Sequence, residues 1–154
     1  VKDSLNSVKL SNMLYPVGSK KYVEVKYDDL SESIFVGRWG HENIVLPTER
    51  YIDQVMQQFG NNANNNSCIM QLNITKQVKD IAFNGKSSNN SMDMQIRILD
   101  GDGKFYQDFS DRSERVFLMG QEEGTVNVAI DYLDGSTQYL QSFCSDATYI
   151  VEQL

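Results

Sequence analysis

The segment from Pro47 to Gly60 constrains the fold most, because every signal for the start and the end of a helix agrees there. Pro47 ends the preceding segment. Thr48 is a good N-cap, and Glu49 follows in the first turn, where the helix dipole favours an acidic side chain. Apolar residues then recur at helical spacing until Gly60, which supplies a stop. The sequence predicts a helix over 48–59.

Two segments after this helix alternate apolar and polar residues, as half-buried strands do. They cover residues 68–74 and 92–98. The second runs into the turn at 100–103, whose glycines permit positive φ, and returns over 104–109 as a β-hairpin. The Gly-, Ser- and Asn-rich segment 85–90 is expected to join the first strand to the second as another hairpin. Antiparallel pairing throughout this region is therefore the simplest interpretation.

The part of the chain before the helix also contains strand patterns. Residues 22–27 and 34–39 are predicted strands, and residues 8–10 are a candidate third.

The C-terminal third supports two interpretations. Residues 126–132 alternate like a strand, and Asp134-Gly135 could form a turn. Apolar and small residues from Val126 to Leu154 also follow an unbroken 4-3-4-3 spacing, which a packed helix needs and a hairpin does not. The longer periodicity favours a C-terminal helix over about 125–152, and a hairpin remains the alternative.

Together these elements predict an α+β fold. A curved antiparallel sheet would be covered on one face by two helices, at about 48–59 and about 125–152. At 154 residues the chain has the size of one ordinary domain. We therefore expect residues 1–154 to form a single domain, with residues 1–7 as a flexible N-terminal lead-in.

The charge balance argues against nucleic acid as a partner. Aspartate and glutamate outnumber lysine and arginine by 21 to 14, which gives a net charge of −7. This balance repels phosphate backbones and anionic lipid head groups. No apolar run approaches the roughly 18 residues that span a bilayer. The polar stretch that opens at Val1 is either an arbitrary boundary or the start of a mature exported chain whose leader or anchor has been removed.

The two cysteines, Cys68 and Cys144, lack the clustered histidines and the C-x-x-C spacing of a zinc site. In an oxidising compartment they could form a disulfide. Otherwise they are buried free thiols that behave as small hydrophobic side chains.

No pattern of catalytic residues stands out, so we expect no enzyme, no metal and no cofactor. The single histidine, His41, lies in a predicted loop, and no nucleophile elbow, Walker loop or zinc-protease helix occurs. Asp100-Gly101-Asp102-Gly103 resembles the opening of a calcium loop, but Phe105 stands where that loop needs glycine. A hairpin turn explains this segment better.

Three aromatic residues are candidates for an interface or a ligand platform. Trp39 is the only tryptophan, and Tyr22 and Tyr27 lie on the neighbouring predicted strand. Trp39 is interpreted first as a core residue, because a tryptophan in a short strand needs no other explanation. If all three were exposed together, they would favour ligand binding.

The order of these elements resembles that of the ABC-type transport auxiliary lipoproteins, over about residues 22–154. The helix that opens at Leu46-Pro47 corresponds to the family's Leu-Pro helix, and residues 68–74 correspond to its long strand. Residues 92–109 resemble its strand, Asp-Gly turn and return strand, and the predicted terminal helix would close the domain. The family's lipid-bearing N-terminal cysteine is absent from this sequence, and the family does not imply a second cysteine.

This resemblance implies a non-enzymatic accessory or scaffold domain of the cell envelope. Such a domain would be periplasmic, or anchored to the outer membrane through an N-terminal anchor outside this sequence. It would assemble with itself as a homo-oligomer, or with protein partners in a transport or secretion complex. From the residues themselves we expect any oligomer interface on the 65–78 strand or on the last helix, because those elements hold the longest apolar rows. The alternative is an extracellular ligand- or glycan-binding module.

Overall fold

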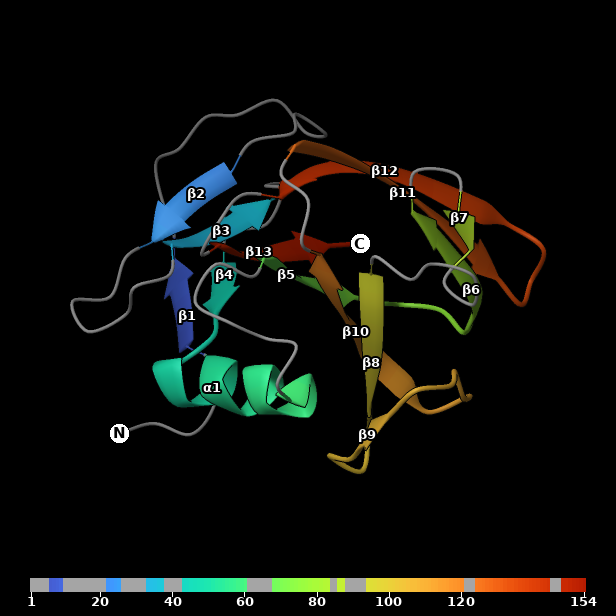
Figure 1. Ribbon diagram of the computed structural model, residues 1–154, viewed down its shortest axis with the longest axis horizontal. Coiled ribbons are helices and arrows are strands. Elements are labelled where there is room, and N and C mark those ends of the chain that lie inside the picture. Colours follow the sequence, from blue (N-terminus) through green and yellow to red (C-terminus); the bar gives the residue numbers. More distant parts are fainter. Residues whose placement is uncertain are drawn as a thin grey trace.

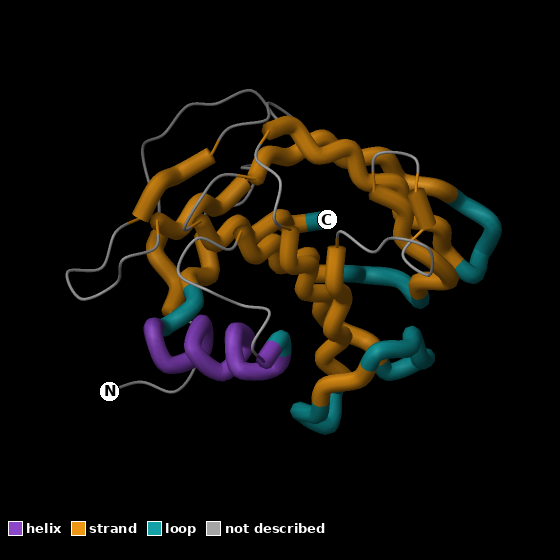
Figure 2. Tube along the Cα trace, in the orientation of Figure 1, coloured by secondary structure: helices purple, strands orange, loops and turns teal. Residues whose placement is uncertain are grey.

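The structure, a computed structural model, describes residues 6–9, 22–25, 33–37, 43–60, 68–83, 86–87, 94–120, 124–144 and 148–154. Its side chains are described at 47–60, 68–83, 95–120, 124–144, 148–152 and 154. The described chain is mostly β, with strands throughout and a single helix (Figures 1 and 2). The fold is β-sandwich-like, so the predicted α+β fold with two helices over one sheet is wrong.

The central sheet has seven strands. In spatial order they are β2 (Tyr22–Val25), β3 (Ser33–Gly37), β13 (Thr148–Gln153), β5 (Cys68–Asn73), β10 (Ser113–Gly120), β8 (Met94–Asp100) and β9 (Phe105–Tyr106). β13 runs parallel to both β3 and β5, and the other pairs are antiparallel. The sheet is therefore mixed, not antiparallel throughout as predicted. β5 pairs with β13 and β10 and not with β8, so the expected hairpin across 85–90 is also wrong.

The outer sheet has four antiparallel strands. In spatial order they are β12 (Thr137–Cys144), β11 (Gly124–Tyr132), β6 (Val78–Phe83) and β7 (Lys86–Ser87). A separate two-stranded sheet pairs β1 (Asn6–Lys9) with β4 (Asn43–Leu46). Asn6 and Ser7 of the expected lead-in thus belong to β1, and residues 1–5 lie outside the described residues.

The main core lies between the central and outer sheets. Residues on one face of β5 and β10, such as Leu72 and Val116, are fully buried against Ile81 and Ile130 of the outer sheet. Burial of each such side chain stabilises the fold by about 1.5–3 kcal/mol. The predicted core face of residues 68–74 is confirmed, because Cys68, Met70 and Leu72 are buried in this cluster.

The opposite face of the central sheet is covered by α1 (Glu49–Gln58), the predicted helix. Thr48 is its N-cap and accepts a hydrogen bond from the Tyr51 N–H at 3.2 Å, as the sequence predicted. Ile52, Val55 and Phe59 are buried against apolar residues of β5, β10 and β13. Figure 1 shows α1 and the outer sheet on opposite sides of the central strands. α1 is too short and too polar to cross a bilayer, and it is the only helix among the described residues.

Arg97 of β8 bonds to the C-terminal end of α1. The Arg97 Nε donates to the carbonyl of Gln58 at 3.0 Å, and its guanidinium carbon lies 5.3 Å from the centre of the Phe59 ring. A cation is favourable here, because the last carbonyls of a helix carry partial negative charge. Gly60 follows with φ +61°, which is the left-handed conformation expected of a helix stop.

The predicted C-terminal helix over 125–152 is wrong. Its residues form β11, β12 and β13 instead. The Tyr132 N–H donates to the Ser136 carbonyl at 2.9 Å, and Gly135 has φ +85°, which no helix interior adopts. Leu133, a core position in the heptad interpretation, is 60% exposed. The alternating pattern of residues 126–132 therefore indicated the correct structure. The 4-3-4-3 spacing of the C-terminal third does not reflect a helix.

Candidate functional site

The outward side of the outer sheet carries a row of three aligned residues from three strands. Ala129 of β11 pairs with Ala82 of β6 on one side and with Tyr139 of β12 on the other. Side chains alternate along a strand, so Val128 and Leu140 point into the core while Tyr139 is 78% exposed. The two alanine side chains are small, so they cover little of the tyrosine ring.

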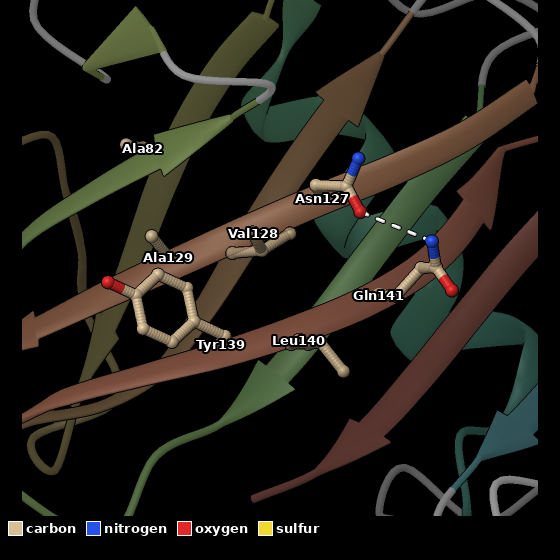
Figure 3. Close-up of a pocket in the computed structure, with 7 residues that line it drawn as sticks. All are labelled: Ala82, Asn127, Val128, Ala129, Tyr139, Leu140 and Gln141. Atoms are coloured by element: carbon tan, nitrogen blue, oxygen red, sulfur yellow. Dashed lines mark hydrogen bonds between the residues drawn. The ribbon is translucent and has the colours of Figure 1, made fainter.

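A hollow of about 440 Å³ lies over this row. Figure 3 shows the residues that line it: Ala82, Asn127, Val128, Ala129, Tyr139, Leu140 and Gln141. We call the exposed residues Asn127, Tyr139 and Gln141, together with Ala82 and Ala129, the Tyr139 face. The Gln141 Nε2 donates to the Asn127 Oδ1 at 3.3 Å, which holds the two amides side by side next to the tyrosine.

The next row along the same side is acidic. Asp131 of β11 pairs with Asp80 of β6 and with Thr137 of β12. The Thr137 hydroxyl donates to the Asp131 Oδ1 at 2.6 Å. These carboxylates repel anions, as does the net charge of −7. The surroundings of the hollow therefore disfavour an anionic ligand.

A second polar cluster lies between α1 and the central sheet. The buried Tyr149 hydroxyl donates to the Gln71 Oε1 at 2.6 Å, and the Gln71 Nε2 donates to the Asn73 Oδ1 at 2.8 Å. The Arg115 Nη1 donates to the Tyr51 hydroxyl at 2.8 Å.

Burial raises the pKa of both tyrosines of this cluster. The pKa of Tyr149 lies well above its usual value of 10.0, and the neighbouring Tyr51 adds to the effect of burial. The pKa of Tyr51 is raised by burial, although the Arg115 charge opposes the change. Both hydroxyls are therefore protonated donors at neutral pH. The cluster joins the helix to the sheet and presents no activated nucleophile.

The aspartate-rich turn is a hairpin, as predicted, because β8 pairs with β9 across it. The buried Asp100 carboxylate accepts hydrogen bonds from the Ser110 and Ser113 hydroxyls. Asp102 accepts from the Lys104 N–H at 3.1 Å. Within the part of the chain that the structure describes, no three acidic, histidine or cysteine side chains are grouped so that they could hold a metal ion.

The structure joins Cys68 of β5 to Cys144 of β12 in a disulfide, with their Cα atoms 5.6 Å apart. The bond crosses from the central to the outer sheet. Trp39 and Tyr27 lie outside the described residues, as does His41, and Tyr22 is described only as a backbone position of β2.

Sequence reasoning missed the Tyr139 face, because residues 125–152 were assigned to a helix. The signal was the alternation of Thr137, Tyr139 and Gln141 with buried partners, which in a strand places an exposed aromatic between polar residues. Comparisons of the chain with models of known protein families, with curated proteins and with solved structures find no match.

Proposed function

We propose that this chain is a non-catalytic binding domain that holds a neutral saccharide on the Tyr139 face. The observation that carries the proposal is the 78% exposed Tyr139 ring beside a hollow whose polar groups are amides. A tyrosine this exposed contributes little to the core, although its ring is a large apolar surface.

The geometry suits a sugar ring in two respects. The C–H groups on one face of a pyranose can stack on the tyrosine ring, with Ala82 and Ala129 leaving room for the rest of the ring. The Gln141 amide offers a carbonyl acceptor and a second N–H donor to the sugar hydroxyls. Because the hollow opens to solvent on the outward side of the sheet, a segment of a longer saccharide chain can lie across it.

We further propose that the domain works in an oxidising compartment, either the cell envelope or the extracellular space. The Cys68–Cys144 disulfide supports this location, because cytosolic proteins keep their thiols reduced. Mass analysis of the native protein with and without reductant tests it. A chain purified with two free thiols would contradict the proposed location.

The binding test is titration calorimetry with neutral oligosaccharides of the cello-, xylo-, chito- and malto- series. Tyr139→Phe keeps the ring face and should bind as the native protein does. Tyr139→Ala should bind roughly tenfold more weakly, which corresponds to a loss of about 1.4 kcal/mol of stacking.

A matched pair of variants locates the ligand on the face. Ala129→Ile fills the hollow with a good strand-forming residue and should abolish binding. Thr125→Ile places the same side chain on the same side of β11 but outside the hollow, and should leave binding unchanged. Binding that survives Ala129→Ile, or no binding by any of the four series, would remove the saccharide proposal.

The second candidate function is an accessory or scaffold domain of the cell envelope with protein partners. The observation that favours it is the long edge strand β12, whose outer side pairs with none of the described strands. The terminal helix on which the lipoprotein resemblance partly depended is replaced by strands. Mass analysis of the full protein from its native cell would test this candidate, which requires a lipidated N-terminal cysteine upstream of this sequence.

A further inference from the structure

Strand β12 is an unusual edge. It lies at the end of the outer sheet, and no described strand pairs with its outer side. It is eight residues long, with the sequence Thr-Gln-Tyr-Leu-Gln-Ser-Phe-Cys. The other described edge strands, β1, β2, β4, β7 and β9, have four residues or fewer.

Natural sheets protect their edges with short strands, charged side chains, proline or bulges. β12 has no charged residue and no proline, and its register with β11 runs without a shift from Cys144 to Thr137. An edge strand that lacks each of these devices is suited to pairing with another strand.

The hairpin geometry shows which main-chain groups point outward. The Tyr132 N–H donates to the Ser136 carbonyl, so these two residues form a hydrogen-bonded pair at the turn. Such pairs alternate along an antiparallel ladder. Gln138, Leu140 and Ser142 therefore direct their N–H and C=O groups toward β11. Thr137, Tyr139, Gln141 and Phe143 direct theirs to the outer side of the strand.

We propose that β12 pairs antiparallel with β12 of a second copy of this chain, centred on Tyr139. This register pairs three of the outward-directed residues with one another, with Tyr139 opposite Tyr139 of the second copy and Thr137 opposite its Gln141. A second copy fits this edge because β12 carries no charge and its outward-directed residues are self-complementary about Tyr139. Two chains of net charge −7 can therefore meet here without like charges facing each other in the ladder.

The dimer joins the two outer sheets into one continuous sheet, with the two-fold axis perpendicular to it. Both Tyr139 faces then lie on the same side, and the two tyrosine rings are adjacent at the centre. This inference does not depend on the proposed saccharide binding, although a double face would hold a long saccharide chain through two sites at once.

The first test is the mass of the protein in solution, by sedimentation and light scattering, from micromolar to millimolar concentration and without saccharide. The mass should rise from 17.6 kDa toward twice that value. A mass that stays at one chain across the whole range overturns the proposal.

The second test uses opposite charges at the centre of the interface. Tyr139→Lys and Tyr139→Glu should each be monomeric, because each would place like charges opposite each other. An equimolar mixture of the two should recover a dimer that contains one of each. Thr125→Lys and Thr125→Glu are the matched controls, because they make the same charge changes on the same side of the non-edge strand β11. Their dimerisation should match that of the native protein.

A third variant tests main-chain pairing. Gln141→Pro removes an outward-directed N–H without removing a bond to β11, and should be monomeric with an unchanged circular dichroism spectrum. If the native protein dimerises but the Tyr139 variants dimerise equally well, the interface lies elsewhere and the proposal fails. If the mixture stays monomeric, the register centred on Tyr139 fails. Ala129→Ile separates this inference from the proposed function, because it should block saccharide binding and leave the dimer intact.

Discussion

At the scale of single residues, Asp134 ties together two loops that are far apart in the sequence. Its Oδ1 accepts the Ser136 N–H at 2.9 Å, and its Oδ2 accepts the Lys76 Nζ at 3.1 Å. The Lys76 Nζ also lies 5.2 Å from the centre of the Tyr132 ring. The β5–β6 connection is thereby held against the β11–β12 turn.

These contacts predict how stability depends on pH. Hydrogen bonds from the Ser136 hydroxyl and N–H, followed by the bond from Lys76, lower the pKa of Asp134 from 3.8 to about 2. The ionised carboxylate is favoured in the folded state, so its contribution is present above pH 3.8 and is lost as the pH falls toward about 2. Asp134→Asn should be less stable than the native protein at neutral pH, and the difference should shrink across this window. Urea unfolding at a series of pH values measures it.

The control for this prediction is Asp108→Asn, which removes one charge from another exposed aspartate. A difference between the native protein and Asp134→Asn that stays constant between neutral pH and pH 2 would contradict the assigned hydrogen bonds.

At the scale of elements, the C-terminal third shows why the sequence was ambiguous. Val126, Ile130, Leu140 and Cys144 are buried in the hairpin and would also be buried in the predicted helix. These positions therefore fit both periods. The residues that distinguish the two structures lie between them: the helix needs Leu133 in the core, whereas the hairpin leaves it exposed.

Replacing Gly135 by alanine distinguishes the turn from the helix, because the two structures predict changes of opposite sign in the free energy of unfolding. In the turn it has φ +85°, and a Cβ added there would meet no atom within 4 Å, so the cost of alanine is conformational only. Gly135→Ala should destabilise the protein by about 1–2 kcal/mol, and Gly135→Asn should cost less. In a helix the same alanine would stabilise by about 1 kcal/mol. Denaturant unfolding distinguishes the two, and a stabilised Gly135→Ala would refute the turn.

The elements predicted correctly were those with local signals. α1 has its own cap and stop, and the β8–β9 hairpin has its own glycine turn. The strand order of the mixed central sheet could not be predicted from local signals. The parallel pairing of β13 with β3 and β5 joins residues far apart in the sequence. The Tyr139 face depends on the same kind of information, since its residues come from three strands.

At the scale of the whole molecule, the disulfide joins the two layers of the sandwich. Cys68 lies on the central sheet and Cys144 on the outer sheet, at a sequence separation of 76. Closing so long a loop in the unfolded chain stabilises the folded state by about 4 kcal/mol in the entropic description.

The prediction is that Cys68→Ala with Cys144→Ala lowers the free energy of unfolding by about this amount, 4 kcal/mol or somewhat more, because a small cavity is also created. Guanidinium unfolding of the native protein with and without reductant measures the same quantity. Reductant should have no effect on the double variant. An equal stability of the oxidised and reduced native protein would show that the bond does not constrain the unfolded chain.

The position of β13 has a consequence for how the molecule is made. Among the described strands, β3 and β5 do not pair with each other, and only β13, inserted between them, connects β2 and β3 to the rest of the central sheet. During synthesis on the ribosome, every earlier strand emerges before β13 is available to pair with β3 and β5. The two parts of the sheet must therefore wait, with open edges, until residues 148–153 leave the exit tunnel. The nascent chain is most vulnerable to aggregation and proteolysis during that interval. Chaperones that bind exposed strand edges would protect it most at that stage.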